Sequence, residues 1–358
     1  MYNHLNVGVV GAGLAGKGHI RMLKRIKKVK IQTICDVNYD ISSKVAREYD
    51  IPTYYTDFVS MLNEEELDFI TVCTPPETHV PISIEAIKSG VNVLIEKPLT
   101  ETTKEAQVIL DALEYHNNVK VGVVHNLLFS RVVQKIRNMF KNGEIGRLLN
   151  LMIIQPGPFN LDPFISNESH WCHKVPGGRI CEALPHQIYL AQEFMNKPQV
   201  KYVSAKKRSN APWVSFDEVL INLESDSSFG SIYWSRNAQK REYFIYLIGS
   251  EGTIKGDLNY GTVVKTRGKL KPKKSEGLQY TFSDTSQLLS SVINHHGRWL
   301  LNKCGIKRAY VYPHEACFRS FIDSIINNHE PYVNAQKGYD CIKIVEEICG
   351  YLEKKLLI

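Results

Sequence analysis

Short apolar runs alternate with segments of helical periodicity along the first third of the chain. Val7–Val10 and Lys30–Cys35 are typical of short strands, and the segment 17–27 between them repeats apolar residues at helical spacing. The alternation continues with strand-like runs at 52–55, 69–73, 91–95 and 119–124 and helix-like segments at 42–49, 57–62, 80–89 and 103–116. This pattern predicts a parallel sheet with helices on both faces.

The pattern changes after about residue 125, where strands with alternating apolar positions dominate. Residues 218–224 and 229–234 flank Ser225-Asp-Ser-Ser and predict an antiparallel hairpin. Strands are also expected at 148–154, 243–249, 253–257, 262–267 and 278–282, and helices at 130–141, 185–195, 287–302, 314–327 and 339–355. We therefore expect an α/β protein with a parallel domain at 1–124 and, at 125–358, an α+β domain with a mostly antiparallel open sheet.

Composition excludes several classes of protein. The chain has 358 residues, enough for two hydrophobic cores, and no apolar run approaches the ~18 residues of a membrane span. Its net charge of +7, from 44 basic and 37 acidic residues, would suit a nucleic-acid partner. The excess is spread over short segments that alternate with apolar residues, and no recognition motif accompanies them. We expect neither a nucleic-acid nor a membrane partner.

The eight cysteines are expected to be reduced. They lie at 35, 73, 172, 181, 304, 317, 341 and 349, and no two form a Cys-x-x-Cys pair. The N-terminus lacks the charged start and apolar core of a signal peptide, which together with the cysteines indicates a cytoplasmic protein. Cys341 and Cys349 fall on one side of an expected helix and are interpreted as packing residues.

A glycine-rich turn follows the first expected strand and opens a helix. It reads Gly11-Ala-Gly13-Leu14-Ala15-Gly16, the Gly-x-Gly-x-x-Gly pattern in its strand–turn–helix setting. Gly11 permits the tight turn, Gly13 lets the backbone approach a pyrophosphate, and Gly16 lets helix and strand pack closely. The backbone amides at the helix start then face the phosphates. This motif predicts a dinucleotide-binding domain of the Rossmann type.

Asp36 strengthens this prediction and favours one cofactor. It ends the second strand twenty residues past Gly16, where a carboxylate can accept hydrogen bonds from the adenosine ribose. A 2′-phosphate at that place would meet a carboxylate without a neighbouring cation, so NAD is expected rather than NADP. Lys44 and Arg47 are the basic residues that could alter this preference.

Two further motifs follow the fourth and fifth strands. They read Thr74-Pro75-Pro-Glu-Thr-His79 and Glu96-Lys97-Pro, and both stand at carboxyl ends of parallel strands, where open α/β sheets bind ligands. With the glycine turn, these segments resemble the Gfo/Idh/MocA family of oxidoreductases, the glucose–fructose oxidoreductase and inositol dehydrogenase group. The likeness covers essentially the whole chain.

This resemblance implies roles for the residues in these motifs. Thr74, Pro75, His79 and Glu96 would line the cofactor site, and Lys97 would point between nicotinamide and substrate. An ammonium group there can hydrogen-bond a reacting hydroxyl and ease its deprotonation.

A third family motif matches residues 177–189. His186 falls on the histidine that serves as general acid or base, a role that its reference pKa of ~6.5 suits. Glu182 replaces the usual aspartate, Leu184 a glycine and Tyr189 the final aspartate. Glu182 could still orient His186 or hold a substrate hydroxyl. The alternative for His186 is a core histidine held by hydrogen bonds.

Four further residues are candidates for substrate binding. Trp171 would lie at the rim of a loop over the substrate, and Arg179 could supply a positive charge. His125 and Asn126 stand where the family carries a substrate-facing segment, although they could equally form hydrogen bonds at the domain boundary.

A zinc site is the competing interpretation of the loop that contains Trp171. Residues of the types that bind zinc are His170, Cys172 and His173, with Cys181, Glu182 and His186 downstream. Their spacing matches none of the usual paired-ligand patterns, so we expect no metal.

The sequence therefore predicts an NAD(P)-dependent oxidoreductase that interconverts a secondary alcohol of a sugar, sugar derivative or cyclitol with its ketone. Two alternatives are a reductase of a non-sugar substrate (an imine, tetrapyrrole or dihydrodiol) and a non-catalytic dinucleotide-sensing protein. The expected partners are a small-molecule substrate and, by resemblance, further copies of the chain in a homodimer or homotetramer associated through the open sheet.

Overall fold

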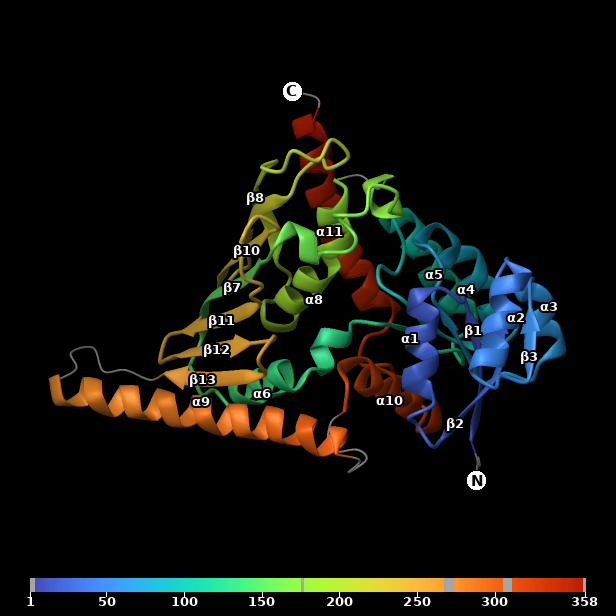
Figure 1. Cartoon of the computed structure of the whole chain (residues 1–358), viewed down its shortest axis with the longest axis horizontal. Helices are drawn as coiled ribbons and strands as arrows, with labels where there is room; N and C mark the ends of the chain where they lie inside the picture. Colours follow the sequence, from blue (N-terminus) through green and yellow to red (C-terminus); the bar gives the residue numbers. More distant parts are fainter. Residues whose placement is uncertain (1–3, 175–176, 267–273, 305–310, 357–358) are drawn as a thin grey trace. The chain divides into compact units, whose positions relative to one another are not determined.

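A computed structural model describes residues 4–174, 177–266, 274–304 and 311–356 (Figure 1). The chain forms two compact units. The first comprises Met1–Asn126 with Tyr312–Glu346, and the second comprises Leu127–Val311 with Glu347–Ile358. Among the described residues, none of the helices combines the length and the apolar content that crossing a bilayer requires.

The first unit contains the expected parallel sheet, whose six strands follow the order β3-β2-β1-β4-β5-β6. Its strands are β1 (Leu5–Val10), β2 (Val29–Cys35), β3 (Thr53–Tyr55), β4 (Phe69–Val72), β5 (Asn92–Ile95) and β6 (Val121–Val123). Its helices are α1 (Leu14–Leu23), α2 (Tyr39–Glu48), α3 (Phe58–Glu64), α4 (His79–Lys88), α5 (Thr103–Tyr115) and α10 (Pro313–Ile326), with the short 3₁₀ helix η1 (Pro76–Thr78). The strand order reverses between β1 and β4, the place where such sheets bind ligands.

Local sequence explains where several of these elements begin. The side chains of Asn38 and Asp57 cap α2 and α3 by accepting a hydrogen bond from a backbone amide of the first turn. Thr102 and Glu105 form a reciprocal capping box at the start of α5. All four residues of β4 are buried, as expected for a central strand with both faces covered.

Helix α10 belongs to the first unit although it lies almost 200 residues further along the chain than β6. The ring of Phe321 packs edge-on against Phe69, with 5.7 Å between centroids. At Gly122 a Cβ atom would lie 2.6 Å from the Phe321 ring, so the glycine admits this close approach. The sequence pattern assigned residues 125–358 to one domain; the structure groups 312–346 with the first unit because the apolar face of α10 is buried there.

The second unit contains a seven-stranded sheet in the order β13-β12-β11-β7-β10-β9-β8. Its strands are β7 (Leu148–Pro156), β8 (Gln199–Lys206), β9 (Glu218–Glu224), β10 (Phe229–Ser235), β11 (Phe244–Gly249), β12 (Thr253–Asp257) and β13 (Thr262–Thr266). Among the described strands of this sheet, β7 and β10 pair in parallel and every other pair is antiparallel. The expected hairpin is confirmed, with Phe229 opposite Glu224.

Helices cover one face of this sheet, as predicted. They are α6 (Arg131–Lys141), α7 (Arg179–Ala183) and α8 (Pro185–Phe194), with the 3₁₀ helices η2 (Asn126–Phe129), η3 (Phe159–Leu161) and η4 (Trp171–Lys174). Helix α11 (Ala335–Leu356) begins in the first unit and ends in the second. α8 packs on β7 and α6 on β12 and β13, whereas the long helix α9 (Lys274–Lys303) follows the edge strand β13 (Figure 1).

Two elements differ from the sequence prediction. The expected strand 278–282 is part of α9, because an alternation over five residues does not distinguish a strand from a helical segment. Strand β8 was not predicted. It is an edge strand in which polar and exposed residues prevail, and a bulge between Val200 and Tyr202 interrupts its alternation.

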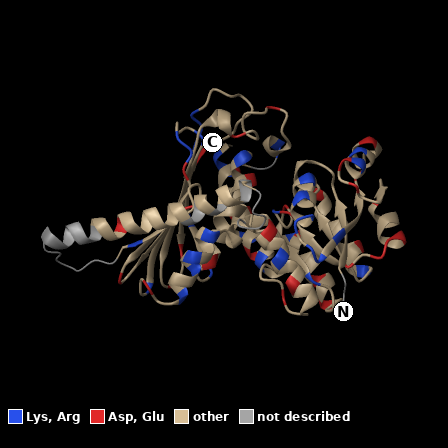
Figure 2. Ribbon diagram, turned by 60° about the horizontal axis from the view of Figure 1, so that its bottom comes forward, with Lys and Arg blue, Asp and Glu red and all other residues tan. Residues whose placement is uncertain are grey.

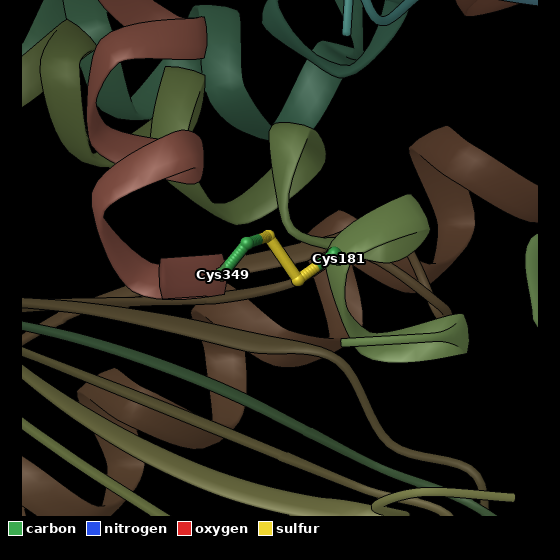
Figure 3. Close-up of a disulfide and its surroundings, with 2 residues drawn as sticks. All are labelled: Cys181 and Cys349. Atoms are coloured by element: carbon green, nitrogen blue, oxygen red, sulfur yellow. A yellow bond between two sulfur atoms is a disulfide. The ribbon is translucent and has the colours of Figure 1, made fainter. Parts of the chain in front are cut away.

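A disulfide joins Cys181 of α7 to Cys349 of α11 (Figure 3). The Cα atoms of the two residues are 6.1 Å apart. The expectation that all cysteines are reduced, and that Cys349 only packs, is therefore wrong for this pair. The two cysteines are 168 residues apart, and no local pattern marks them as partners. Cys341 is buried, as expected.

Candidate functional site

In the turn after β1, two of the three glycines leave no room for a side chain, and the third has free space beside it. Gly11 has a φ of +96°, and a Cβ there would lie 2.8 Å from the backbone of Cys73. A Cβ at Gly16 would lie 1.9 Å from the carbonyl oxygen of Gly11. At Gly13 a Cβ would have no neighbour within 4 Å. The turn therefore needs glycine at its ends for its own geometry and leaves its middle open to a ligand.

The start of α1 has the properties of an anion site. No side chain caps its first turn, and no acidic residue stands in that turn. Leu14 and Ala15 are exposed at its beginning. The backbone amides of a helix start carry partial positive charge, so this turn can hold the phosphates of a dinucleotide.

Asp36 is fixed beside this turn by two backbone amides. Its Oδ2 accepts a hydrogen bond from the amide of Ala12 at 2.8 Å, and its Oδ1 accepts one from Asn38 at 3.0 Å. A carboxylate has further lone pairs, so Asp36 can still accept hydrogen bonds from ribose hydroxyls. The guanidinium of Arg47 donates to the carbonyl of Ser43 within α2. The chain thus places a fixed carboxylate where the ribose of a dinucleotide would bind.

Glu96 connects the glycine-turn helix to Lys97. Its Oε1 lies 2.8 Å from Nε2 of His19 on α1, and its Oε2 accepts a hydrogen bond from the backbone amide of Lys97 at 2.9 Å. Burial alone would raise the pKa of this carboxyl group, but the contacts with His19 outweigh it and lower the pKa to about 2. Glu96 is therefore ionised and holds the backbone on which Lys97 stands, at the carboxyl end of β5.

His19 is a buried residue that the sequence did not mark as functional. Its Nδ1 lies 3.1 Å from Sγ of Cys73, and its ring packs edge-on against Phe318 at 4.6 Å between centroids. Burial alone would lower its pKa, but Cys73 and Glu96 raise it to about 10. His19 is thus an imidazolium that pairs with Glu96. In the sequence, His19 is part of the buried face of α1 with Ile20 and Leu23, and no motif marks it.

His79 holds together the loops that follow β4 and β5. Its Nε2 lies 3.0 Å from the carbonyl oxygen of Thr74, and its Nδ1 lies 3.0 Å from that of Pro98 and 3.1 Å from that of Leu99. Burial lowers the pKa of His79, so its ring is neutral. Pro75 is exposed on the same loop as Thr74. The structure therefore places His79 beneath the two loops.

His125 and Asn126 lie where the first unit ends. His125 is buried, and burial lowers its pKa to about 3, so the ring is neutral at physiological pH. The side-chain amide nitrogen of Asn126 lies 3.4 Å from Nδ1 of His314 on α10. These contacts tie the end of the sheet to α10.

In the second unit, Tyr189 contacts His186 through its hydroxyl. The phenolic oxygen lies 2.8 Å from Nδ1 of His186, and it accepts a hydrogen bond from the backbone amide of Leu127 at 3.2 Å. Tyr189 is buried and stands one helical turn after His186 on α8. Tyr189, which stands where the family carries an aspartate, thus supplies a polar group that can orient the imidazole.

Glu182 and Arg179 belong to a buried network of four charged residues. Arg179 pairs with Glu182 and, at 3.0 Å, with Asp162, and Asp162 also accepts from Arg236 at 2.7 Å. Burial would raise the pKa of Asp162, but Arg179 and Arg236 outweigh it and lower the pKa to about 2. The sequence did not single out Asp162 or Arg236, because they are far apart along the chain and match no motif.

The loop before α7 contains the residues that were weighed as zinc ligands. Trp171 is 39% exposed, and the ring of His170 packs on Phe164. Nε2 of His173 lies 3.1 Å from the carbonyl oxygen of Phe164, and Cys181 is bonded to Cys349. Across the ranges that the structure describes, no group of three His, Cys, Asp or Glu side chains is arranged to hold a metal ion.

Comparison with known families agrees with this geometry. The model described as "Oxidoreductase family, NAD-binding Rossmann fold" matches residues 5–125, and that described as "Oxidoreductase family, C-terminal alpha/beta domain" matches residues 139–349. The chain belongs to the Gfo/Idh/MocA oxidoreductase family. The resemblance inferred from the motifs is therefore confirmed, and the first unit is an NAD-binding domain.

Three similar proteins illustrate the range of this family. The chain is 30% identical to the uncharacterised oxidoreductase YrbE of Bacillus subtilis, over 74% of this chain and 77% of the relative. It is 24% identical to levoglucosan dehydrogenase of Pseudarthrobacter phenanthrenivorans, over 70% and 73%. The solved structure of myo-inositol 2-dehydrogenase from Lactobacillus plantarum superposes with a TM-score of 0.75 at 20% identity, covering 98% of both chains.

Within each unit of this Gfo/Idh/MocA protein, the structure brings expected residues together. In the first unit, the open glycine turn, Asp36 and the braced Lys97 all follow carboxyl ends of strands in one sheet, and they fit a dinucleotide. In the second, Glu182 and Arg179 of α7 and His186 and Tyr189 of α8 come from consecutive helices. The first group contains an ammonium group, and the second contains an imidazole.

Proposed function

We propose that this oxidoreductase interconverts a secondary alcohol of a sugar, sugar derivative or cyclitol with the corresponding ketone. The observation that carries the proposal is Glu96, which joins the helix of the phosphate-binding turn to the backbone of Lys97. A lysine held in this way beside a cofactor site can act on an oxygen atom of a substrate. The names of two relatives, levoglucosan dehydrogenase and myo-inositol 2-dehydrogenase, support polyhydroxylated ring substrates.

The proposed chemistry divides between the two units. The glycine turn and Asp36 would hold NAD, which would supply the hydride acceptor for the carbon that carries the hydroxyl group. The ammonium of Lys97 donates a hydrogen bond to the hydroxyl oxygen and stabilises the negative charge that develops on it. His186 removes the hydroxyl proton through Nε2, while Tyr189 orients the ring through Nδ1. In the direction of reduction, the same groups return the proton to the oxygen.

The arrangement around Asp36 supports NAD as the preferred cofactor. Both carboxylate oxygens are fixed by backbone amides, so the negative charge cannot turn away from the place of a 2′-phosphate. Arg47 is engaged by Ser43 on its own helix. A 2′-phosphate would therefore meet an anion that the neighbouring residues hold in place.

The experiment that tests this function measures turnover of NAD and NADP with a panel of sugars, cyclitols and their ketones. We expect at least one polyol to reduce NAD, and the variant Lys97→Met to lose roughly 10²- to 10⁴-fold in kcat/KM while it still binds NADH. Lys104→Met, at an exposed position on α5, is the matched control and should keep full activity.

Four results would contradict the proposal or favour an alternative. Unchanged turnover in Lys97→Met would remove the lysine from the mechanism. Tight binding of NADH without turnover of any alcohol or ketone would favour a dinucleotide-sensing protein, whereas turnover of an imine or dihydrodiol alone would favour a non-sugar substrate. Loss in Lys97→Met with unchanged turnover in His186→Asn would also favour the reductase of a non-sugar substrate.

A further inference from the structure

Helix α9 is fixed to the edge of the second unit's sheet along one of its faces. Gln287 donates a hydrogen bond to the carbonyl oxygen of Lys265 at 3.0 Å and accepts one from its amide at 2.9 Å. One turn further along, the hydroxyl of Ser291 donates to the carbonyl oxygen of Val263 at 3.3 Å. These contacts hold the helix along β13 and determine which of its faces points away from the sheet (Figure 1).

The opposite face of α9 is apolar and exposed. Phe282, Leu289, Ile293 and Leu300 are 69%, 61%, 61% and 57% exposed. At 3.6 residues per turn, their directions lie within about 40° of one another and about 180° from Ser291. They form a single stripe, which we call the α9 seam. An apolar stripe of this length on a soluble domain indicates a surface that another molecule covers.

The charge of α9 restricts what that molecule can be. Between residues 281 and 301 the sequence contains only two charged residues, Asp284 and Arg298. In Figure 2 the coloured part of the helix is mostly tan, whereas Lys and Arg are scattered over other elements of both units. A helix that lies on a membrane surface carries many Lys and Arg on its polar face. The polar face of α9 instead contacts β13 through Gln287 and Ser291.

The spacing of the α9 seam fits a second copy of the same helix. We propose that α9 pairs antiparallel with α9 of a second chain, around a two-fold axis at position 291. This axis brings Phe282 opposite the partner's Leu300, and Leu289 opposite the partner's Ile293. Each seam residue thereby meets another seam residue, as an isologous interface requires. The intervals of seven, four and seven residues are those of the a and d positions of a coiled coil.

The area available is sufficient for a stable contact. With the flanking residues Val292 and Trp299, which are 40% and 44% exposed, the seam offers on the order of 700 Å² of apolar surface per chain. A standard interface takes roughly 800 Å² from each partner. This surface is separate from the open face of the sheet, where Leu220 and Phe229 are exposed. The helix thus supplies a two-fold contact in addition to any contact through the sheet.

The first experiment compares molar masses in solution by light scattering or sedimentation. We expect Leu289→Glu with Ile293→Glu to halve the mass of the native assembly, because four buried charges would face one another across the axis. Ser290→Glu with Leu301→Glu adds the same charge to the flank of the helix opposite Val292 and Trp299, and should keep the native mass. Unfolding temperatures of both variants report whether each chain is folded. A monomeric native protein at ~100 µM, or an unchanged mass in the seam variant, would overturn the proposal.

The second experiment tests the register by cross-linking in a Cys304→Ser background, which removes an exposed thiol. Leu289→Cys with Ile293→Cys places two thiols opposite each other across the axis and should give a covalent dimer under mild air oxidation. Phe282→Cys with Leu289→Cys also carries two thiols on the α9 seam, but neither faces the other in the antiparallel register. Equal or greater dimer formation in this second variant would contradict the antiparallel pairing.

Discussion

The two units hold their functional residues in different ways. In the first, the backbone makes the site: a positive φ at Gly11, an open approach at Gly13 and amides that fix Asp36 and Glu96. In the second, contacts between side chains hold the residues: Tyr189 contacts His186, and Arg179 joins Glu182 to the distant Asp162. A site built from backbone tolerates few residue types at each position, so its motif can be recognised. A site built from paired side chains depends on contacts between segments that no short motif relates, so it is harder to recognise in the sequence.

The sharpest test of the backbone-built site is Gly16→Ala. Its Cβ would lie 1.9 Å from the carbonyl oxygen of Gly11, a distance that forces the turn and α1 apart. We expect the affinity for NADH to fall at least about 100-fold, or the first unit to lose stability by several kcal/mol. Titration of NADH fluorescence and the unfolding temperature measure the two effects. Gly18→Ala, where a Cβ meets nothing within 4 Å, should leave binding unchanged.

In the second unit, Cys349→Ser removes a cross-link that closes a long segment of chain. The disulfide spans 168 residues, and such a bond stabilises by roughly 2–4 kcal/mol, mainly through the unfolded state. Chemical denaturation should show this loss, and a reducing agent should destabilise the native protein but not the variant. Cys304→Ser, at an exposed cysteine, is the control. Equal stability of the native protein with and without reductant would contradict the bond.

Tyr189→Phe tests whether the altered motif of the second unit still orients His186. The variant keeps the buried ring but removes the hydroxyl group that contacts Nδ1 and accepts from the amide of Leu127. We expect kcat to fall about tenfold with little change in the affinity for NADH, because the imidazole loses its orienting partner. Tyr243→Phe, at another buried tyrosine of this unit, should retain activity. A fully active Tyr189→Phe enzyme would reduce Tyr189 to a packing residue.

The ion pair of His19 and Glu96 stabilises the first unit to an extent that depends on pH, and we expect its removal to have a smaller effect than the preceding substitutions. The pKa of His19 rises from 6.5 to about 10 on folding, so its stabilisation is complete below pH 6.5 and is lost as the pH rises through 10. The pKa of Glu96 falls from 4.5 to about 2, so its stabilisation is complete above pH 4.5 and is lost as the pH falls towards 2.

The difference in unfolding temperature between the native protein and His19→Gln should therefore be largest between pH 4.5 and 6.5. It should narrow on either side of that window. A difference that stays constant from pH 4 to 10 would mean that His19 acts through packing against Phe318 alone.

The sequence predicted the fold of both units because their periodicities are local. Alternation identified the β9–β10 hairpin, and the glycine turn with Asp36 identified the NAD-binding domain. The sequence prediction failed where contacts between distant segments determine the structure. The strand expected at 278–282 is helical, and the Cys181–Cys349 bond joins segments that no local pattern relates.

The candidate site shows the same division. Lys97 and Asp36 were singled out through motifs; in the structure the backbone amide of Lys97 donates to the Glu96 carboxylate, and the Asp36 carboxylate accepts from the amide of Ala12. His19 was overlooked because a histidine on an apolar helix face carries no signal of its partner, which is Glu96, 77 residues away. Glu182 was expected to serve His186 or the substrate, and the structure pairs it with Arg179.

The contacts between α9 and β13 also determine where the seven-stranded sheet ends. An edge strand offers unpaired amides and carbonyls to which a further strand can add. On β13, Gln287 and Ser291 occupy these groups at Lys265 and Val263, so strand addition is blocked on that side. At the other edge, β8 carries a bulge, which disrupts the ladder that a new strand would need. Copies of this chain can therefore associate through faces and helices without extending the sheet into a fibril.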